Sequence, residues 1–174
     1  MEFYDVIEKR KSFRKFKPDL VSMDTIKRIL NAARLAPTWA NMQGVKFIVV
    51  NDKETAEKVG IAVGQKWAQY CPMFIVAINK ASSSGMNSGL KYFMLDVGIV
   101  FEHVMLAATA EGLGTCWIGH FSEDEIKKIL SIPGKYRVVA LTPLGYPSDP
   151  AKETSRKPLS SMVHVNKYGE KLEN

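Results

Sequence analysis

The sequence predicts one domain of mixed helix and strand. The chain has 174 residues, and 46% of them are hydrophobic, which is enough for a folded core. Segments with helical periodicity alternate with short apolar runs that are typical of buried strands. No internal repeat, low-complexity tract or linker divides the chain. We therefore expect a single domain over residues 1–174, with a polar C-terminal arm from about residue 148 to 174.

The first half of the chain alternates helices and strands. Ser22 is a candidate N-cap, and apolar residues recur at helical spacing until Pro37 ends the pattern. Two later apolar runs are typical of strands. The predicted elements are a helix from about residue 2 to 10, an amphipathic helix over 22–36, a strand over 45–50, a helix from 52 to about 70 and a buried strand over 73–78.

The second half contains the longest predicted helix, from about Leu90 to Glu111, with apolar residues on nearly every face. Such a helix must be covered all round, either wholly by this chain or partly by a second subunit, and the pattern favours neither. Glu102 and His103 interrupt its most apolar stretch, 97–110, which is too short to cross a bilayer. The remaining predicted elements are a weak strand over 115–118, a short helix over 123–131 opened by a Ser122–Glu125 capping box, a strand over 136–144 and an edge strand over 161–165.

Charge and cysteine content narrow the function classes. An excess of 24 Lys and Arg over 18 Asp and Glu gives a net charge of +6, which favours anionic partners such as phosphates, nucleotides or nucleic acid. Residues 1–16 contain no apolar run, so the sequence predicts no secretory signal, no membrane anchor and a cytoplasmic protein. Cys71 and Cys116 fit neither a Cys-x-x-Cys motif nor a zinc site, and we expect buried, reduced thiols.

Several common catalytic motifs are missing. The position of the third glycine in a dinucleotide-binding G-x-G-x-x-G motif holds Trp117, so no Rossmann site is expected. There is no P-loop, the three histidines do not form H-E-x-x-H, and no G-x-S-x-G nucleophile elbow occurs. Phosphoryl transfer from a P-loop and these hydrolase mechanisms are therefore disfavoured, and we expect no metal site.

Basic and polar residues suit a phosphate at both ends of the chain. Arg10, Lys11, Ser12 and Arg14 close the first helix, and fixed guanidinium groups beside a hydroxyl are what a phosphate requires. The alternative is a solvated basic face. Arg156 begins a second basic pair in the arm, which is either a solvated charge or the completion of a phosphate cage with Arg10 and Ser12.

Two further segments offer amides and glycines. The turn after the 22–36 helix contains Pro37, Thr38, Trp39, Asn41 and Gln43. These residues serve ordinary turn chemistry, but a large indole in a polar turn covers either core or a flat ligand. Gly119 ends the 115–118 strand, where it is either a plain strand terminus or a place at which a planar ligand approaches backbone N–H groups.

Four motifs in this order resemble the nitroreductase family of flavin enzymes. They are R-K-S-F-R-K-F at residues 10–16, A-P-T-W-A-N-M-Q at 36–43, G-L-G-T-C-W-I-G at 112–119 and R-K-P-L at 156–159. The resemblance implies an α+β, three-layer fold with a central mixed, mostly antiparallel sheet flanked by helices. It also implies an intertwined homodimer, with the arm packing across the dimer and one FMN at each subunit interface.

The resemblance assigns roles to individual residues. Arg10, Ser12 and Arg156 would hold the phosphate of FMN with help from Lys11, and Arg14 would lie at the pyrimidine end of the flavin. The remaining implied FMN contacts are Pro37, Thr38, Trp39, Asn41 and Gln43 from the other subunit, Ile118 and Gly119 facing flavin N5, and Gln65.

The implied activity is ping-pong hydride transfer from NADH or NADPH through flavin N5 to an electron-poor acceptor such as a nitroaromatic or a quinone. The residues by themselves leave alternatives: a flavin-modifying or dehalogenating enzyme, a flavin-binding protein without turnover, or a basic nucleic-acid-binding protein. The last is disfavoured because the basic residues are not interleaved with aromatic residues or placed on one recognition helix. We expect a small-molecule acceptor as partner, and neither nucleic acid nor membrane.

The chain departs from the family pattern at three positions. Gly44 stands where proline is usual, His103 replaces a frequent asparagine, and Ser161 replaces a common acidic residue. The long insertion that lines the acceptor pocket in larger members is also missing. The pocket is therefore expected to be open or built by Trp67, Tyr70 and Phe93.

Overall fold

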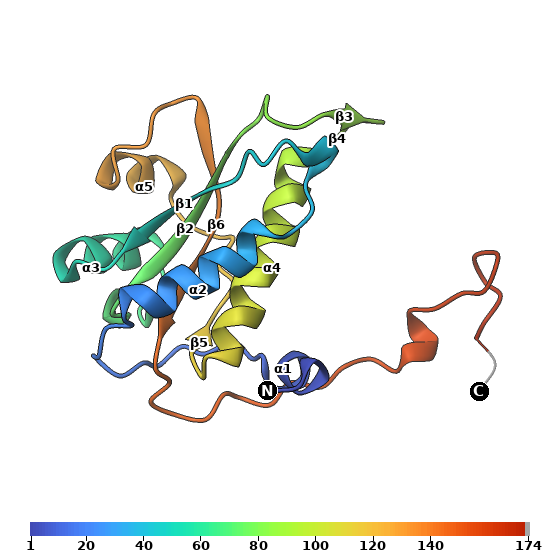
Figure 1. Cartoon of the computed structure of the whole chain (residues 1–174), viewed down its shortest axis with the longest axis horizontal. Helices are drawn as coiled ribbons and strands as arrows, with labels where there is room; N and C mark the ends of the chain where they lie inside the picture. The colour runs from blue at the N-terminus through green and yellow to red at the C-terminus, as the bar shows by residue number, and fades with distance from the viewer. Residues whose placement is uncertain (173–174) are drawn as a thin grey trace.

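A four-stranded antiparallel sheet forms the centre of the protein, which we describe from a computed structural model over residues 1–172. The strands lie in the order β1 (Lys46–Val50), β2 (Phe74–Lys80), β6 (Tyr136–Gly145) and β5 (Gly114–Thr115). A separate hairpin of β3 (Met86–Asn87) and β4 (Leu90–Lys91) lies at one end of the longest helix (Figure 1). The sheet was expected to contain both parallel and antiparallel pairs. Its strands pair antiparallel throughout the described residues, and the parallel pairing is a single isolated bridge between Ser12 and Thr115.

Helices cover both faces of this sheet. α2 (Met23–Arg34) and α4 (Tyr92–Ala110) lie on one face, and α3 (Lys53–Ala62) and α5 (Glu123–Ile129) lie on the other (Figure 1). α1 (Phe3–Lys9) packs against α4. Three short 3₁₀ turns complete the elements: η1 (Trp39–Asn41), η2 (Ala68–Tyr70) and η3 (Leu159–Ser161). The predicted three-layer α+β architecture is confirmed.

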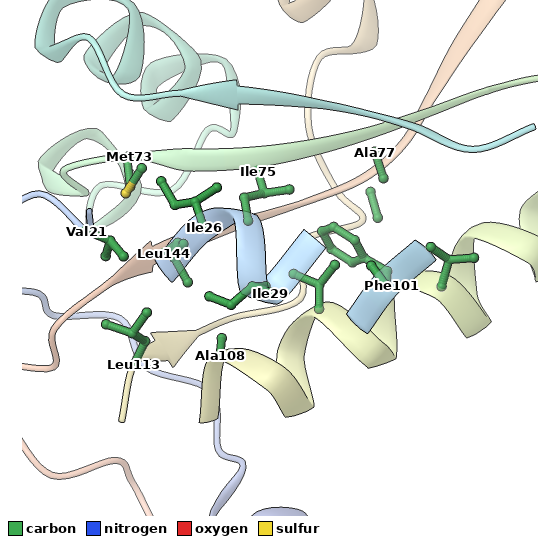
Figure 2. Packing of buried hydrophobic residues seen from close by; sticks show 14 of the residues in the cluster. Val21, Ile26, Ile29, Met73, Ile75, Ala77, Phe101, Ala108, Leu113 and Leu144 are labelled. Carbon is green, nitrogen blue, oxygen red and sulfur yellow. The ribbon is translucent and has the colours of Figure 1, made fainter. Parts of the chain in front are cut away.

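The core consists of two clusters separated by the sheet. Because successive strand residues point to opposite faces, Ile75 and Ala77 of β2 pack under α2 and α4, where Phe101 fills the largest volume (Figure 2). The alternate residues Phe74, Val76 and Ile78 face α3 and α5. Every residue of β2 except Lys80 is buried, which explains why this strand is a continuous apolar run in the sequence.

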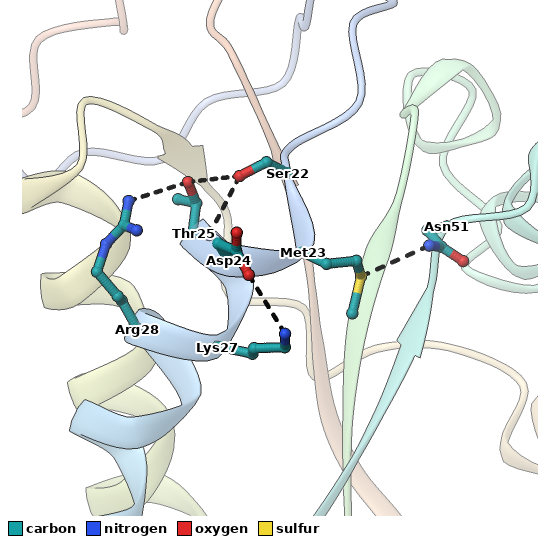
Figure 3. Close-up of polar contacts among 7 residues, drawn as sticks. All are labelled: Ser22, Met23, Asp24, Thr25, Lys27, Arg28 and Asn51. Carbon is teal, nitrogen blue, oxygen red and sulfur yellow. Dashed lines mark hydrogen bonds and ion pairs between the residues drawn. The ribbon is translucent and has the colours of Figure 1, made fainter.

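Local polar contacts fix the ends of α2. The Ser22 hydroxyl accepts the Thr25 N–H at 3.2 Å, so the predicted N-cap is confirmed (Figure 3). One turn further along α2, Arg28 donates from Nε and Nη2 to both carboxylate oxygens of Glu111, each at 2.8 Å, and from Nη2 to Thr25 Oγ1 at 3.1 Å (Figure 3). Glu111 caps the C-terminus of α4, where the helix dipole disfavours a negative charge, and Arg28 offsets that cost. These contacts join α2 to α4.

α4 is the core helix of the domain. The helix has 19 residues, Tyr92–Ala110, and is longer than the apolar stretch 97–110 that was judged too short to cross a bilayer. By length and composition alone, the whole helix is long and apolar enough to span a membrane. Half of that apolar window is buried inside the protein, against α2 and the sheet. Met94, Leu95 and Ile99 remain exposed on its outer side. Of the two alternatives left open by the sequence, this chain by itself covers the helix only in part, and cover by a second subunit stays a prediction.

Two predicted helix features are wrong. The helix expected over 52–70 stops at Ala62, because Gly64 adopts a φ of 75° that leaves the helical region, and η2 is a separate turn. The capping box expected at the start of α5 is not formed: Ser122 makes no side-chain cap. Glu123 in the first turn instead accepts hydrogen bonds from Arg137 and from the N–H of Val138.

Two predicted strands are also corrected. The strand expected over 115–118 is limited to β5, and Ile118 forms only an isolated bridge with Leu141. The segment 161–165 is not an edge strand, because the arm contains η3 and a small bridge between His164 and Lys171. Beyond about residue 150 the arm passes α1 and extends away from the body (Figure 1).

Candidate functional site

Residues 10–14, which we call the basic segment, connect α1 to the edge of the sheet. Arg10 caps the C-terminus of α1 by donating its N–H to Val6 O. Phe13 N–H donates to Thr115 O at 2.8 Å, next to the bridge between Ser12 and Thr115. In extended backbone, alternate side chains share a side, so Ser12 and Arg14 point away from the side that Phe13 occupies.

The basic segment lies beside the buried Cys116 thiol. Burial raises the pKa of Cys116, and the Arg14 and Arg10 charges and a hydrogen bond with the Ser12 hydroxyl oppose that rise. Arg10, Ser12 and Arg14 therefore lie on a stretch of chain that runs beside β5, and Ser12 forms a bridge with Thr115 directly before Cys116. Arg10 Nε also lies 3.9 Å from Glu102 Oε1, which fixes its direction along α4.

The start of the C-terminal arm passes the basic segment. Lys15 Nζ lies 2.6 Å from Asp149 Oδ2, and Lys11 Nζ lies 3.9 Å from Glu153 Oε1. A cavity of about 330 Å³ lies between the two segments, lined by residues 12–15 and 149–152. Arg156 follows three residues after Glu153, but its guanidinium group bonds its neighbours Thr154 and Ser155. The arm therefore approaches Arg10 and Ser12, and no described contact joins Arg156 to them.

The turn over residues 38–43 has a strained backbone. Ala40, Asn41 and Gln43 adopt φ values of 43°, 56° and 49°, which are uncommon for residues other than glycine. Hydrogen bonds within the turn support it, because Gln43 N–H donates to Thr38 Oγ1 at 3.0 Å and Gln43 Nε2 donates to Asn41 O at 3.3 Å. Three strained residues in one short turn are typical of a functional site that the surrounding structure holds in place.

Asp96 of α4 anchors this turn. Its carboxylate accepts the Trp39 N–H at 2.7 Å through Oδ1 and the Ser84 hydroxyl through Oδ2. Asp96 is 2% exposed, and among residues 1–172 no lysine, arginine or histidine lies within ion-pair distance of it. A buried carboxylate without a cation is costly unless hydrogen bonds satisfy it, so these two bonds tie the turn firmly to α4.

Trp39 covers protein surface on one side and stays 38% exposed on the other. Its indole packs on Tyr92 with ring centroids 4.3 Å apart. A Cβ added to Gly85 would lie 2.4 Å from the indole, so this position needs glycine. The same holds at Gly44, where a Cβ would lie 2.6 Å from Ser83 Oγ. The departure from proline at Gly44 thus accommodates the segment that carries Ser83 and Ser84.

The predicted flavin-facing pair at the end of β5 divides into a buried and an exposed residue. Ile118 is buried in the cluster under α3 and α5, and it exchanges backbone hydrogen bonds with Leu141 at 2.9 and 3.1 Å. Its side chain is therefore part of the core and does not face a ligand. Gly119 is exposed, directly after this bridge. Of the pair, Gly119 is the residue that a ligand can approach.

The predicted acceptor pocket is partly corrected. Phe93 is buried in α4 beneath the hairpin and cannot line an open pocket. Trp67 and Tyr70 do line a cavity of about 520 Å³, together with Arg14, Lys15, Phe16, Lys66 and Ser148. Gln65 contacts this region indirectly, because its Oε1 accepts the Trp67 Nε1–H at 2.8 Å.

The basic segment and the strained turn lie at different positions along α4. The turn is fixed to Asp96 in the second turn of the helix, whereas Thr115, which pairs with Ser12, follows its last turn. A helix rises 1.5 Å per residue, so the 14 residues from Asp96 to Ala110 span roughly 20 Å. One chain therefore does not bring Thr38, Trp39 and Asn41 together with Arg10 and Ser12.

Residues missed in the sequence give the site its support. Asp96 and Ser84 hold the strained turn, and Lys66 joins Arg14 beside Trp67. A carboxylate within the apolar run 92–110 was the available signal for Asp96, since carboxylates are almost never fully buried without a purpose. Nothing local marked Ser84 or Lys66, because their roles depend on contacts distant in sequence.

Comparison with known proteins identifies the family to which this chain belongs. The family model described as "Nitroreductase family" matches residues 7–70 and 61–146. A solved structure of a nitroreductase family protein from Clostridium novyi NT is 40% identical, with a TM-score of 0.82 and coverage of 98% of this chain and 97% of that one. The chain therefore belongs to the nitroreductase family.

Other relatives in this family carry names of oxidoreductases. A protein from Archaeoglobus fulgidus, named after NADH dehydrogenase and NAD(P)H nitroreductase activities, is 31% identical over 85% of this chain and 87% of its own length. A structure titled FMN-dependent nitroreductase, from Clostridium difficile R20291, is 26% identical with a TM-score of 0.78, covering 94% of this chain and 98% of that one.

Proposed function

We propose that this chain is a cytoplasmic, FMN-dependent oxidoreductase that transfers hydride from NADH or NADPH to an electron-poor acceptor such as a nitroaromatic or a quinone, in a ping-pong sequence. The observation that carries the proposal is the basic segment, with Arg10, Ser12 and Arg14, which is bridged to β5 and lines a cavity together with the start of the arm. The names of the relatives support an NAD(P)H oxidoreductase, and one structural relative is titled FMN-dependent.

The residues present fit the phosphate of FMN. Arg10 and Ser12 supply a guanidinium group and a hydroxyl beside β5, and Lys11 adds a second cation from the same segment. Charge-assisted hydrogen bonds of this kind are the strongest that a phosphate makes with protein. We propose that Arg156 joins them when a phosphate is present, by leaving its bonds to Thr154 and Ser155.

Arg14 suits the other end of the cofactor. FMN, when bound, supplies the hydride acceptor and donor at ring N5. The Arg14 guanidinium lies 5.9 Å from the centroid of the Trp67 ring, and this cation–π contact holds it in place. A fixed cation near the pyrimidine end of the ring stabilises the negative charge that reduction brings, so it favours hydride acceptance. Gly119 leaves room for the ring to approach the backbone.

A homodimer completes this site. The strained turn of one chain lies too far along α4 to reach its own basic segment. If two α4 helices pair in opposite directions about a two-fold axis, the turn of each protomer comes to the basic segment of the other. Pro37, Thr38, Trp39, Asn41 and Gln43 would then contact FMN from the second subunit. The exposed apolar residues of α4 support such pairing.

Purified protein tests the proposal directly. We expect it to retain FMN after gel filtration, to show flavin absorbance, and to oxidise NADH or NADPH when menadione is added. Arg10→Ala should weaken FMN binding about 10-fold or more, since a hydrogen bond to a charged group contributes about 1.5–3 kcal/mol. Lys128→Ala, on the exposed surface of α5, is the control and should change nothing. A colourless protein that keeps no added FMN would refute the proposal.

The Arg14→Ala variant tests the tuning of the flavin. We expect the midpoint potential of bound FMN to fall by about 30 mV, which corresponds to about 1.4 kcal/mol for a two-electron couple. The measurement is dye-equilibrated reduction of the FMN-loaded variant. Arg14→Lys should keep most of the potential because it keeps the charge. An unchanged potential in Arg14→Ala with FMN still bound would remove this role.

A further inference from the structure

A groove beside the basic segment combines cations with aromatic rings. We call it the aromatic–basic groove: Arg14, Lys15, Phe16, Lys66, Trp67, Tyr70 and Ser148. Its residues come from three separate segments, namely the stretch after α1, the turn between α3 and η2, and the start of the arm. Its volume of about 520 Å³ lies within the range of roughly 300–1,000 Å³ that is common for small-molecule sites.

The groove is positively charged. Arg14, Lys15 and Lys66 line it, and none of its lining residues is acidic. Lys15 is already paired with Asp149 at 2.6 Å, and Arg14 lies over the Trp67 ring. Among residues 1–172, no carboxylate lies within 4.0 Å of the Lys66 ammonium, so Lys66 is the cation left for a ligand.

The aromatic rings of the groove are available for stacking. Tyr70 is 77% exposed, which is unusual for a residue whose ring would gain from burial. Trp67 is fixed because its Nε1–H donates to Gln65 Oε1 at 2.8 Å. Arg14 lies 5.9 Å from the centroid of the Trp67 ring, so a planar molecule can stack on the exposed Tyr70 ring and against the part of the fixed Trp67 indole beside Arg14.

We propose that this groove makes the enzyme select planar aromatic acceptors that carry a carboxylate or sulfonate. The ring of the acceptor stacks on Trp67 and Tyr70, and its anionic group faces Lys66. The inference rests on the proposed function, because Arg14 places the groove next to the flavin end of the site. The sequence motifs do not address acceptor charge, since Lys66 and Trp67 lie outside all four.

Two matched pairs of compounds test the proposal with FMN-loaded enzyme. Benzoate and its neutral isostere benzamide are not reduced, so calorimetry measures binding alone. 4-Nitrobenzoate and methyl 4-nitrobenzoate measure kcat/KM with and without the charge. We expect tighter binding of benzoate, a higher kcat/KM for the acid, and a loss of both preferences in 0.5 M salt, where screening is nearly complete beyond about 3–5 Å.

Lys66→Gln assigns the preference to one residue. We expect it to lower the acid-to-ester ratio of kcat/KM, and the benzoate-to-benzamide ratio of affinity, about fivefold, the size that one partly exposed ion pair contributes. Lys128→Gln removes the same charge from the exposed surface of α5, outside the groove, and should leave both ratios unchanged. Tyr70→Leu should weaken benzoate and benzamide together, because it removes the exposed stacking ring and no charge.

The outcomes separate this inference from the proposed function. A protein without FMN or NAD(P)H oxidation overturns the proposed function, whatever benzoate does. A yellow, active enzyme that treats the acid and the ester alike overturns the groove alone. If Lys66→Gln raises the KM for NADPH but not for NADH and leaves the acceptor ratios intact, the groove binds the nicotinamide donor's extra phosphate, and the acceptor proposal is wrong.

Discussion

At the scale of single residues, Asp96 shows how a buried charge positions a site that it does not touch chemically. It satisfies a backbone N–H of the strained turn and the hydroxyl of Ser84 at once. The turn stores backbone strain at Ala40, Asn41 and Gln43, so it needs such an anchor to persist. We therefore regard Asp96 as a positioning residue for the proposed FMN site.

The Asp96→Ala variant should lose both stability and cofactor. Removing the carboxylate leaves the Trp39 N–H and the Ser84 hydroxyl without their partner, which costs about 1–3 kcal/mol for each group that stays buried. We expect hydrogen exchange over residues 38–43 to accelerate and FMN affinity to fall. Asp96→Asn keeps one acceptor oxygen for the Trp39 N–H and should restore much of the FMN affinity.

A second buried polar residue of α4 controls for general destabilisation. Thr109 donates its hydroxyl only to Met105 O of the same helix, at 2.9 Å. Thr109→Val should lower stability without changing exchange in the turn. If Asp96→Ala and Thr109→Val of equal stability also bind FMN equally, Asp96 has no positioning role.

The sequence predicted which residues are candidates for the site better than it predicted their contacts in the folded chain. Arg10 and Ser12 were expected to hold a phosphate together with Arg156, and that assignment stays a prediction, because the Arg156 guanidinium bonds its own neighbours in this structure. Ile118 was assigned to the ligand side, but the bridge to Leu141 turns it into the core. That bridge depends on a strand more than 20 residues away, and no local pattern reports it.

At the scale of elements, the sequence predicted helix ends correctly where the residues that fix them lie within one helical turn. α2 was predicted because Ser22 caps it and its apolar residues recur at helical spacing. The end of α3 was missed because apolar residues continue past Gly64 into η2. The capping box predicted over Ser122–Glu125 was wrong, because Ser122 makes no side-chain cap and the neighbouring Glu123 bonds Arg137 and the Val138 N–H of β6.

Those partners make Glu123 the electrostatic link between α5 and β6. Partial burial opposes ionisation of its carboxyl, but hydrogen bonds from Arg137, Lys127 and the Val138 N–H outweigh burial and lower the pKa of Glu123 to about 2. Arg137 is bound through Nε and Nη2 at 2.8–3.0 Å. The ionised form is therefore preferred in the folded state.

The pH dependence of stability should show this link. A pKa of about 2 when folded, against a usual value of 4.5, means that the contribution is complete above about pH 4.5 and is lost as the pH falls towards 2. A shift of this size corresponds to roughly 3 kcal/mol as an upper value. We expect Glu123→Gln to lower the free energy of unfolding at pH 7, measured by urea titration, and to flatten its decline below pH 5.

The neighbouring carboxylate provides the control. Glu125 lies on the same first turn of α5 and is exposed. Glu125→Gln should change the free energy of unfolding at pH 7 by a few tenths of a kcal/mol at most, as is usual for a surface charge. Equal effects of the two variants would show that the helix dipole, and not the contact with β6, carries the stabilisation.

At the scale of the whole molecule, the single chain forms a complete core but would form only part of the proposed FMN site. Both hydrophobic clusters are closed by residues of this chain. The outer side of α4 is not closed, and α1 beside it exposes Phe3, Tyr4 and Ile7. The sequence predicted a helix with apolar residues all round, and the structure shows which of its residues its own chain leaves uncovered.

The separation of the strained turn and the basic segment along α4 suggests a role for the exposed apolar residues of this helix in pairing two chains. In the proposed function, the turn anchored at Asp96 and the basic segment at Thr115 would each supply part of the FMN site, and roughly 20 Å of helix separates them in one chain. Pairing through Leu95 and Ile99 would bring complementary parts together twice, once at each end of the interface. Dimerisation and FMN binding should therefore be lost together.

Ile99→Glu tests this coupling. Ile99 is 45% exposed on the outer side of α4, so a charge there is compatible with a folded monomer but not with an apolar interface. We expect wild-type protein to have the mass of a dimer by light scattering, and the variant to be monomeric, to melt cooperatively and to keep less than about a tenth of the FMN affinity. The control is Ile61→Glu, which places the same charge at a 58% exposed position on α3, on the opposite side of the sheet, and should remain dimeric and yellow. A wild-type monomer that binds FMN, or an Ile99→Glu monomer that binds it as tightly as the wild type does, would show that one chain suffices and that the strained turn serves another purpose.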